Sequence, residues 1–85
     1  MINPLTVADG NGIDFNKTKT FQNRIYHIGN INNQTTNPPI STSSSAIYVN
    51  IGNGNRVCEM LFGVEQSFIF SRYNGGDWKR VDNWG

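Results

Sequence analysis

The sequence has little of what holds many small proteins in shape. Its 85 residues include a single cysteine, Cys58, so an internal disulfide is impossible. No apolar run approaches the 18 or more residues that cross a bilayer, and the N-terminus lacks the basic start and apolar stretch of a signal peptide. We therefore expect neither membrane insertion nor an export signal.

Charge is also scarce. Charged residues make up 15% of the chain, and the net charge is +1. Proteins that capture nucleic acid or anionic membranes do so through clustered Lys and Arg, so we expect neither partner. Disordered chains usually combine high net charge with few aromatics, whereas this chain has 12% aromatic residues. The composition predicts a folded protein with a neutral, polar surface.

Strong helix formers are few. Ala and Leu total four residues, Ile and Val total fourteen, and thirteen Asn and nine Gly interrupt or cap helices. This inventory predicts a mostly β protein. A single domain of this size buries only about 60% of its unfolded surface. Without a disulfide or a metal cluster, association with copies of itself is the remaining source of stability, and we expect an oligomer.

The first half of the chain is irregular. Asp9-Gly10 and Asn11-Gly12 favour tight turns, and we expect residues 1–20 to form an N-terminal arm or tether with one short strand. Residues 21–28 are the first segment typical of a strand. Residues 30–45 are rich in Asn, Ser and Thr and contain Pro38-Pro39, a composition that predicts a surface loop.

The second half predicts a meander. Strands are expected at residues 46–51, 57–62, 67–73 and 78–81, with turns at Gly52–Asn55, Gly63–Gln66 and Asn74–Asp77. Along the first of these strands Ile47, Val49 and Ile51 share one face. Short strands separated by glycine turns are typical of all-β folds. We therefore predict an all-β domain over residues 21–85, a small antiparallel β meander or sandwich.

Few residues offer catalytic chemistry. His27 and Cys58 are the only histidine and cysteine, and a lone imidazole cannot build a zinc site. Cys58 alternates with Met60 and Phe62, which favours a small buried hydrophobe over a reactive thiol. Asp77 and Asp82 are the nearest candidates for a glycosidase pair, but both flank turns, where Asp bonds its own backbone. We expect no catalysis, no metal and no cofactor.

The segment from Phe68 to Trp84 holds five of the ten aromatics and three of the seven basic residues. Such rings could stack on the bases of single-stranded nucleic acid, although the net charge argues against it. With neighbouring Asn and Asp they could instead bind sugars. The third alternative is that Trp78 and Trp84 close a small core, which we favour because the chain has few apolar residues to spare.

Several short motifs in the chain resemble one family. Arg72-Tyr73-Asn74-Gly75 is followed after a short gap by Trp78-Lys79-Arg80-Val81. Upstream lie Ile25-Tyr26-His27-Ile28, Asn37-Pro38-Pro39, and the apolar strands at 46–51 and 57–62. In this order the motifs resemble the small knob domains of phage tail fibres and the related pyocin fibres, over residues 20–82. Two features depart from that family: Trp84 falls after the ending, and Glu59 stands where glutamine is usual.

The resemblance implies a module of a virion appendage, made in the host cytoplasm and assembled as a homotrimer with copies of itself or with other tail proteins. Its function would be to bind a saccharide on the host surface, through loops 30–45 and 52–55. The alternative is a purely structural trimerisation or capping domain without a ligand. The candidate ligand-binding residues are Tyr48, Arg72, Tyr73, Asn74, Trp78 and Trp84.

Overall fold

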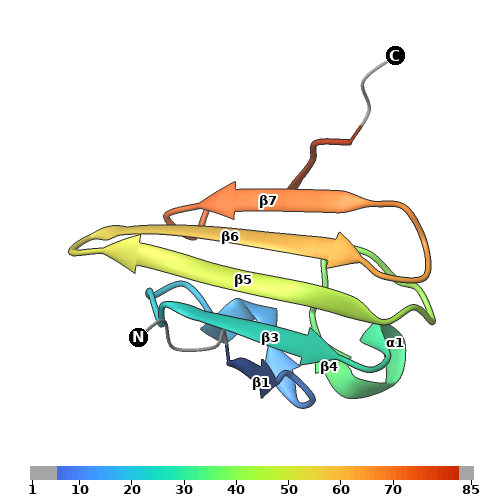
Figure 1. Cartoon of the computed structure of the whole chain (residues 1–85). Helices are drawn as coiled ribbons and strands as arrows, with labels where there is room; N and C mark the ends of the chain where they lie inside the picture. The colour runs from blue at the N-terminus through green and yellow to red at the C-terminus, as the bar shows by residue number, and fades with distance from the viewer. Residues whose placement is uncertain (1–5, 83–85) are drawn as a thin grey trace, which may run out of the picture.

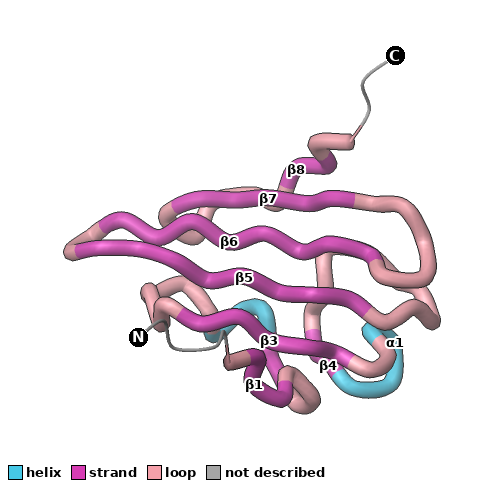
Figure 2. The backbone as a smooth tube through the Cα atoms, viewed as in Figure 1, coloured by secondary structure: helices cyan, strands magenta, loops and turns pink. Residues whose placement is uncertain are grey.

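The computed structural model describes residues 6–82, which form a six-stranded sheet and a separate two-stranded sheet (Figures 1 and 2). The large sheet has the order β1 (Val7–Asp9), β3 (Arg24–Ile28), β5 (Ala46–Asn53), β6 (Arg56–Gly63), β7 (Ile69–Tyr73) and β8 (Lys79–Arg80). The small sheet pairs β2 (Ile13–Asp14) with β4 (Thr35–Thr36). The helical segments are the 3-10 turn η1 (Phe15–Lys17) and α1 (Ile31–Gln34).

The meander predicted for the second half is confirmed. β5, β6, β7 and β8 pair consecutively and antiparallel, and β3 pairs antiparallel with β5. The hairpin between β5 and β6 turns at Gly54, whose φ of 63° favours glycine. The described chain is mostly β, as predicted, but it is not purely antiparallel. β1 lies parallel to β3, and β2 lies parallel to β4.

The parallel pair of β1 and β3 follows from what lies between them. Parallel neighbours need a long crossover connection, and residues 10–23 provide one. These residues and residues 30–45 supply the layer that covers one face of the large sheet, which we call the covered face (Figure 1). The apolar core between sheet and layer consists of Phe15, Ile28, Ile31, Ala46, Tyr48, Leu61 and Phe68.

The described part of the N-terminal segment is not a tether, and that prediction was wrong. Phe15 is fully buried, and its ring packs edge-on against Tyr48 at a centroid distance of 5.2 Å. Asp14 caps η1 by accepting a hydrogen bond from the Asn16 N–H at 3.0 Å. Scattered apolar residues here escaped the sequence patterns because a single buried ring is enough to anchor an irregular segment.

The segment from residue 30 to residue 45 is likewise more than a surface loop. Asn30 caps α1 through its side chain, and Ile31 is fully buried. The backbone N–H of Ile31 donates to the Ser44 carbonyl at 3.0 Å, which closes the segment on itself. Local hydrogen bonds and one buried aliphatic side chain therefore order a stretch whose composition alone predicted little structure.

The opposite face of the large sheet, which we call the open face, has no segment over it among residues 6–82 (Figure 1). Its strand register places these side chains on it: Val7, Asp9, Ile25, His27, Ile47, Val49, Ile51, Asn53, Arg56, Cys58, Met60, Phe62, Ile69, Ser71, Tyr73 and Lys79. Ile51 is 55% exposed, and the central side chains are half-buried only by one another. Cys58 is exposed here, so the prediction of a buried thiol was wrong.

No helix in the described chain is long and apolar enough to cross a membrane.

Candidate functional site

The structure separates the candidate ligand-binding residues instead of gathering them. Tyr48 and Arg72 point into the covered face and are buried, whereas Tyr73 and Asn74 are exposed. Trp78 is half-buried, and Trp84 lies outside the described residues. The consecutive side chains of Arg72 and Tyr73 thus point to opposite faces of the sheet, because side chains alternate along a strand.

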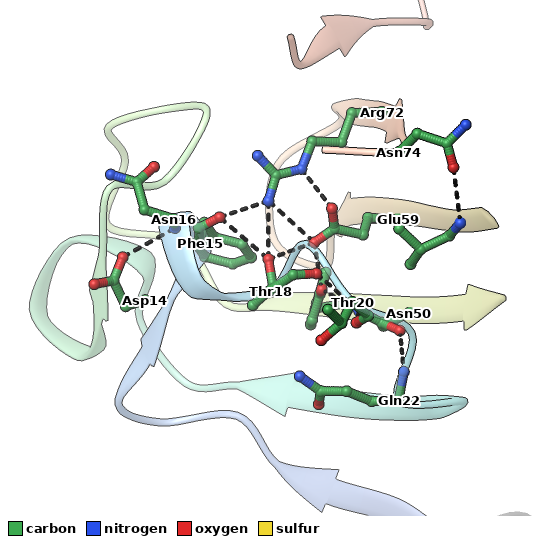
Figure 3. A network of polar contacts seen from close by, with 12 residues as sticks. Asp14, Phe15, Asn16, Thr18, Thr20, Gln22, Asn50, Glu59, Arg72 and Asn74 are labelled. Atoms are coloured by element: carbon green, nitrogen blue, oxygen red, sulfur yellow. Dashed lines mark hydrogen bonds and ion pairs between the residues drawn. The ribbon is translucent and has the colours of Figure 1, made fainter. Parts of the chain in front are cut away.

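Tyr48 and Arg72 belong to a buried polar cluster that we define as Thr18, Tyr48, Asn50, Glu59 and Arg72. Figure 3 labels Thr18, Asn50, Glu59 and Arg72 of this cluster. Asn50, Glu59 and Arg72 sit opposite one another on β5, β6 and β7. Arg72 Nε donates to Glu59 Oε2 at 2.5 Å in an ion pair that is almost fully buried. The two charged groups need further hydrogen-bond partners, because burying a charged group without hydrogen bonds costs free energy of folding.

The covering segment supplies those partners. Arg72 Nη2 donates to the Phe15 carbonyl at 2.5 Å and to Thr18 Oγ1 at 2.9 Å. The Thr18 hydroxyl donates in turn to Glu59 Oε1. Asn50 Nδ2 donates to the Thr18 and Thr20 carbonyls, each at 3.2 Å. The polar cluster therefore fastens residues 15–20 to the sheet.

Tyr48 completes the cluster. Its hydroxyl donates to Glu59 Oε1 at 2.5 Å and accepts from Asn50 Nδ2 at 3.0 Å. Burial, followed by the hydrogen bond to Glu59, raises the pKa of Tyr48 well above its ordinary value. The phenol stays protonated and keeps its donor role across the neutral range. Because the polar atoms of Tyr48 and Arg72 are used inside the protein, neither residue is free to bind a ligand.

Trp78 also packs against interior side chains. Its ring lies 5.9 Å from that of Phe15, edge-on, and the Arg72 guanidinium carbon lies 4.6 Å above it. The indole Nε1 is buried. A cation over a tryptophan face is attractive, and here it also closes the outer side of the polar cluster. These contacts support the interpretation of Trp78 as core closure over that of a sugar-binding ring.

The remaining two candidates lie together at one end of the open face. Tyr73 is 74% exposed and follows Arg72 at the end of β7. Asn74 begins the next turn with a φ of 53°, and its Oδ1 accepts from the Val57 N–H at 3.0 Å. That bond fixes the turn against β6, so the position of Tyr73 is set by the sheet.

Tyr73 and Asn74 line a shallow hollow of about 640 Å³, which we call the Tyr73 hollow. Its other walls come from the hairpin of β5 and β6, and the full lining is Ile51, Gly52, Asn53, Arg56, Val57, Cys58, Tyr73 and Asn74. The hollow combines an exposed ring, two amides and a guanidinium with an apolar floor. Its volume falls within the range of small-molecule sites.

The sequence analysis named only part of this hollow. Loop 52–55 was expected to present polar groups, and Asn53 does line the hollow. Arg56 was not identified, because an isolated arginine next to a turn carries no local signal. Loop 30–45 lies at the opposite end of β5, beside Ala46, and does not line the hollow.

The residues considered for catalysis do not converge. His27 and Cys58 both lie on the open face, but they are two strands and four residue positions apart, a separation of about 16 Å. Asp82 forms an ion pair with Arg80 at 2.7 Å, and this hydrogen bond holds the pKa of Asp82 below its ordinary value. Among residues 6–82, no three His, Cys, Asp or Glu side chains group as metal ligands do.

No protein-family model, curated protein or solved structure matches this chain. The roles of the Tyr73 hollow and of the open face are therefore argued from geometry.

Proposed function

We propose that this chain is a structural module of a virion appendage, of the tail-fibre or pyocin-fibre kind, that binds a saccharide of the host surface without catalysis. The resemblance of motifs between residues 20 and 82 to those of knob domains supports the setting. The neutral, amide-rich and hydroxyl-rich composition suits a protein that works outside a cell without disulfides. In this setting the module is a homotrimer that contacts host saccharide or neighbouring tail proteins.

The observation that carries the saccharide proposal is the exposed ring of Tyr73 over the Tyr73 hollow. A phenol ring offers a flat apolar face for the C–H side of a pyranose, and it loses little conformational entropy on binding. Asn53 and Arg56 contribute amide and guanidinium groups that bond sugar hydroxyls. Because Asn74 is anchored through Oδ1, its Nδ2 is held in place to donate to a ligand.

Glycan-array binding of the purified chain tests this function. We expect wild-type protein to bind host cell-wall glycans and Tyr73→Ala to lose that binding. Phe21→Ala is the matched control, because Phe21 is also an exposed aromatic, at 42%, and does not line the hollow. Failure of the wild type to bind any host glycan, or full binding by Tyr73→Ala, would contradict the proposal.

A purely structural trimerisation or capping domain is the second candidate. The open face favours it, because a contiguous apolar surface on a protein this small usually marks an interaction site. A capping domain predicts stable oligomers with no glycan affinity. The array result and a solution mass therefore separate the two functions.

A further inference from the structure

The open face is the largest unexplained feature of the molecule. Its centre consists of Ile25, Ile47, Val49, Met60, Phe62 and Ile69, and no described segment covers them. A sheet normally buries one face and exposes polar side chains on the other. Here the exposed side is the more apolar of the two, because the covered face holds Asn50, Glu59 and Arg72.

We infer that the open face packs against the open faces of further copies of this chain. The inference does not rest on saccharide binding. It rests on the apolar surface, on its dimensions and on the placement of its few charges, and these are considered in turn.

The dimensions suit sheet-to-sheet packing. Neighbouring strands lie about 4.8 Å apart and rise about 3.3 Å per residue. Because β1, β3 and β7 are shorter than β5 and β6, the strands β1 to β7 present roughly 460 Å². Two such faces bury roughly 900 Å² in total, which is the size of weak or transient interfaces. Aligned sheets pack about 10 Å apart with interdigitating side chains, the separation that Ile, Val, Met and Phe fill.

The charges favour a copy of the same chain over an unrelated partner. Asp9 lies at the β1 edge of the face, Lys79 at the β8 edge and Arg56 at the hairpin end of β6, and the centre is uncharged. When the symmetry axis runs along the strands, a twofold sandwich and a threefold prism both bring the β1 edge of one copy beside the β8 edge of another. Asp9 then meets Lys79 of a neighbouring copy, so the face is complementary to itself.

Cys58 provides a native probe of this contact. It lies on the open face, between Ile51 and Tyr73 in the register, and it is the only cysteine of the chain. Packing of copies across the face shields the thiol, whereas contact through any other surface leaves it open. Its reaction with a maleimide under otherwise reducing conditions therefore reports on the face itself.

The experiment combines solution mass with thiol labelling of the full chain. We expect light scattering to return a multiple of 9.5 kDa at micromolar concentration, and we expect Cys58 to react severalfold faster after dilution to the monomer. Val49→Lys should return the monomer mass with fast labelling, since Val49 lies at the centre of the face. Thr36→Lys, on the exposed side of the covering layer, should behave as wild type.

Either a dimer or a trimer mass with concentration-dependent Cys58 protection supports the inference. A wild-type mass of 9.5 kDa overturns it, and so does an oligomer in which Cys58 labelling is independent of concentration. If Val49→Lys does not fold by circular dichroism, the wild-type mass and labelling still decide the question. A monomer mass also contradicts the homotrimer of the proposed function, whereas the glycan array tests saccharide binding alone. Because Cys58 lines the Tyr73 hollow as well, packing that shields this thiol covers part of the hollow, so a Cys58-protected oligomer without glycan affinity supports this inference and contradicts the saccharide proposal.

Discussion

The two faces of the large sheet use the alternation of side chains in opposite ways. On the covered face, Asn50, Glu59 and Arg72 form a row across three strands and are almost completely buried. On the open face, the neighbouring row of Val49, Met60 and Ser71 is only half-buried. Apolarity therefore does not decide which face of this sheet is interior. The decision lies with the segments that cross it and with the hydrogen-bonding groups they bring.

Burial of the charged row depends on the covering segment. The Phe15 carbonyl and the Thr18 hydroxyl satisfy donors and acceptors that the strands themselves cannot reach. Without them, the ion pair of Arg72 and Glu59 would lose part of its compensation for desolvation. The apolar side chains of the open face need no hydrogen-bond partners, and they are half-buried only by one another. The comparison predicts that equivalent substitutions on the two faces have very different costs.

Removing one charge from the covered face should have the largest effect. Arg72→Met keeps the side-chain volume but leaves Glu59 buried without its cation, and we expect the free energy of unfolding to fall by about 3–5 kcal/mol. Urea unfolding followed by tryptophan fluorescence measures the loss. Arg24→Met, which removes an exposed arginine of β3 in the same sheet, should leave the unfolding curve unchanged.

A double variant sharpens this result. Adding Glu59→Gln to Arg72→Met removes the uncompensated charge while keeping an oxygen for Thr18 and Tyr48 to donate to. We expect the double variant to regain about 1–2 kcal/mol relative to Arg72→Met. If the double variant were no more stable than the single one, the cost would not arise from the unpaired carboxylate.

A pair of isoleucines compares the faces directly. Ile28 on β3 is fully buried on the covered face, and Ile51 on β5 is 55% exposed on the open face. Ile28→Ala should cost about 2–5 kcal/mol through the cavity it leaves. Ile51→Ala should cost about 1 kcal/mol or less, mainly through the lower strand propensity of alanine. Unfolding is measured at a protein concentration that keeps the chain monomeric, and equal losses would contradict the assignment of the faces.

Alkaline pH should lower the free energy of unfolding gradually, through the Tyr48 phenol of the covered face. Because the folded pKa of Tyr48 is raised, its contribution to stability is fully present below the pKa of the unfolded residue, near 10, and is lost as the pH rises above it. The free energy of unfolding should fall with a slope approaching about 1.4 kcal/mol per pH unit for this group. Tyr48→Phe lacks this contribution, and parallel curves for the two proteins between pH 9 and 11 would refute it.

Strands and turns were predictable because their signals are local. Alternating apolar residues and Asn-Gly or Gly-Gly turns predicted β5, β6, β7 and β8 within a few residues, and Ile25 to Ile28 predicted most of β3. The roles of Phe15, Thr18 and Ile31 were not predictable. Each is a single residue in an irregular segment, and its burial depends on a partner tens of residues away.

The residues of the candidate site also fall into those that the sequence predicted and those whose place only the structure shows. Tyr73 and Asn74 belong to the Arg72-Tyr73-Asn74-Gly75 motif that resembles knob domains, and the exposure of Tyr73 follows from the alternation of β7. Arg72 from the same motif and Tyr48 from the middle of β5 were candidates too, yet the structure places both in the buried polar cluster. Arg56 joins the hollow only because the hairpin brings it toward Tyr73.

By itself, the sequence determined the strand pattern, the turns and the two sets of side chains along each strand, since backbone preference and alternation act between near neighbours. Tertiary structure alone decided which set became the interior. Residues 10–23 and 30–45 cross one face and satisfy its buried polar groups, and contacts over such separations depend on the whole chain having folded.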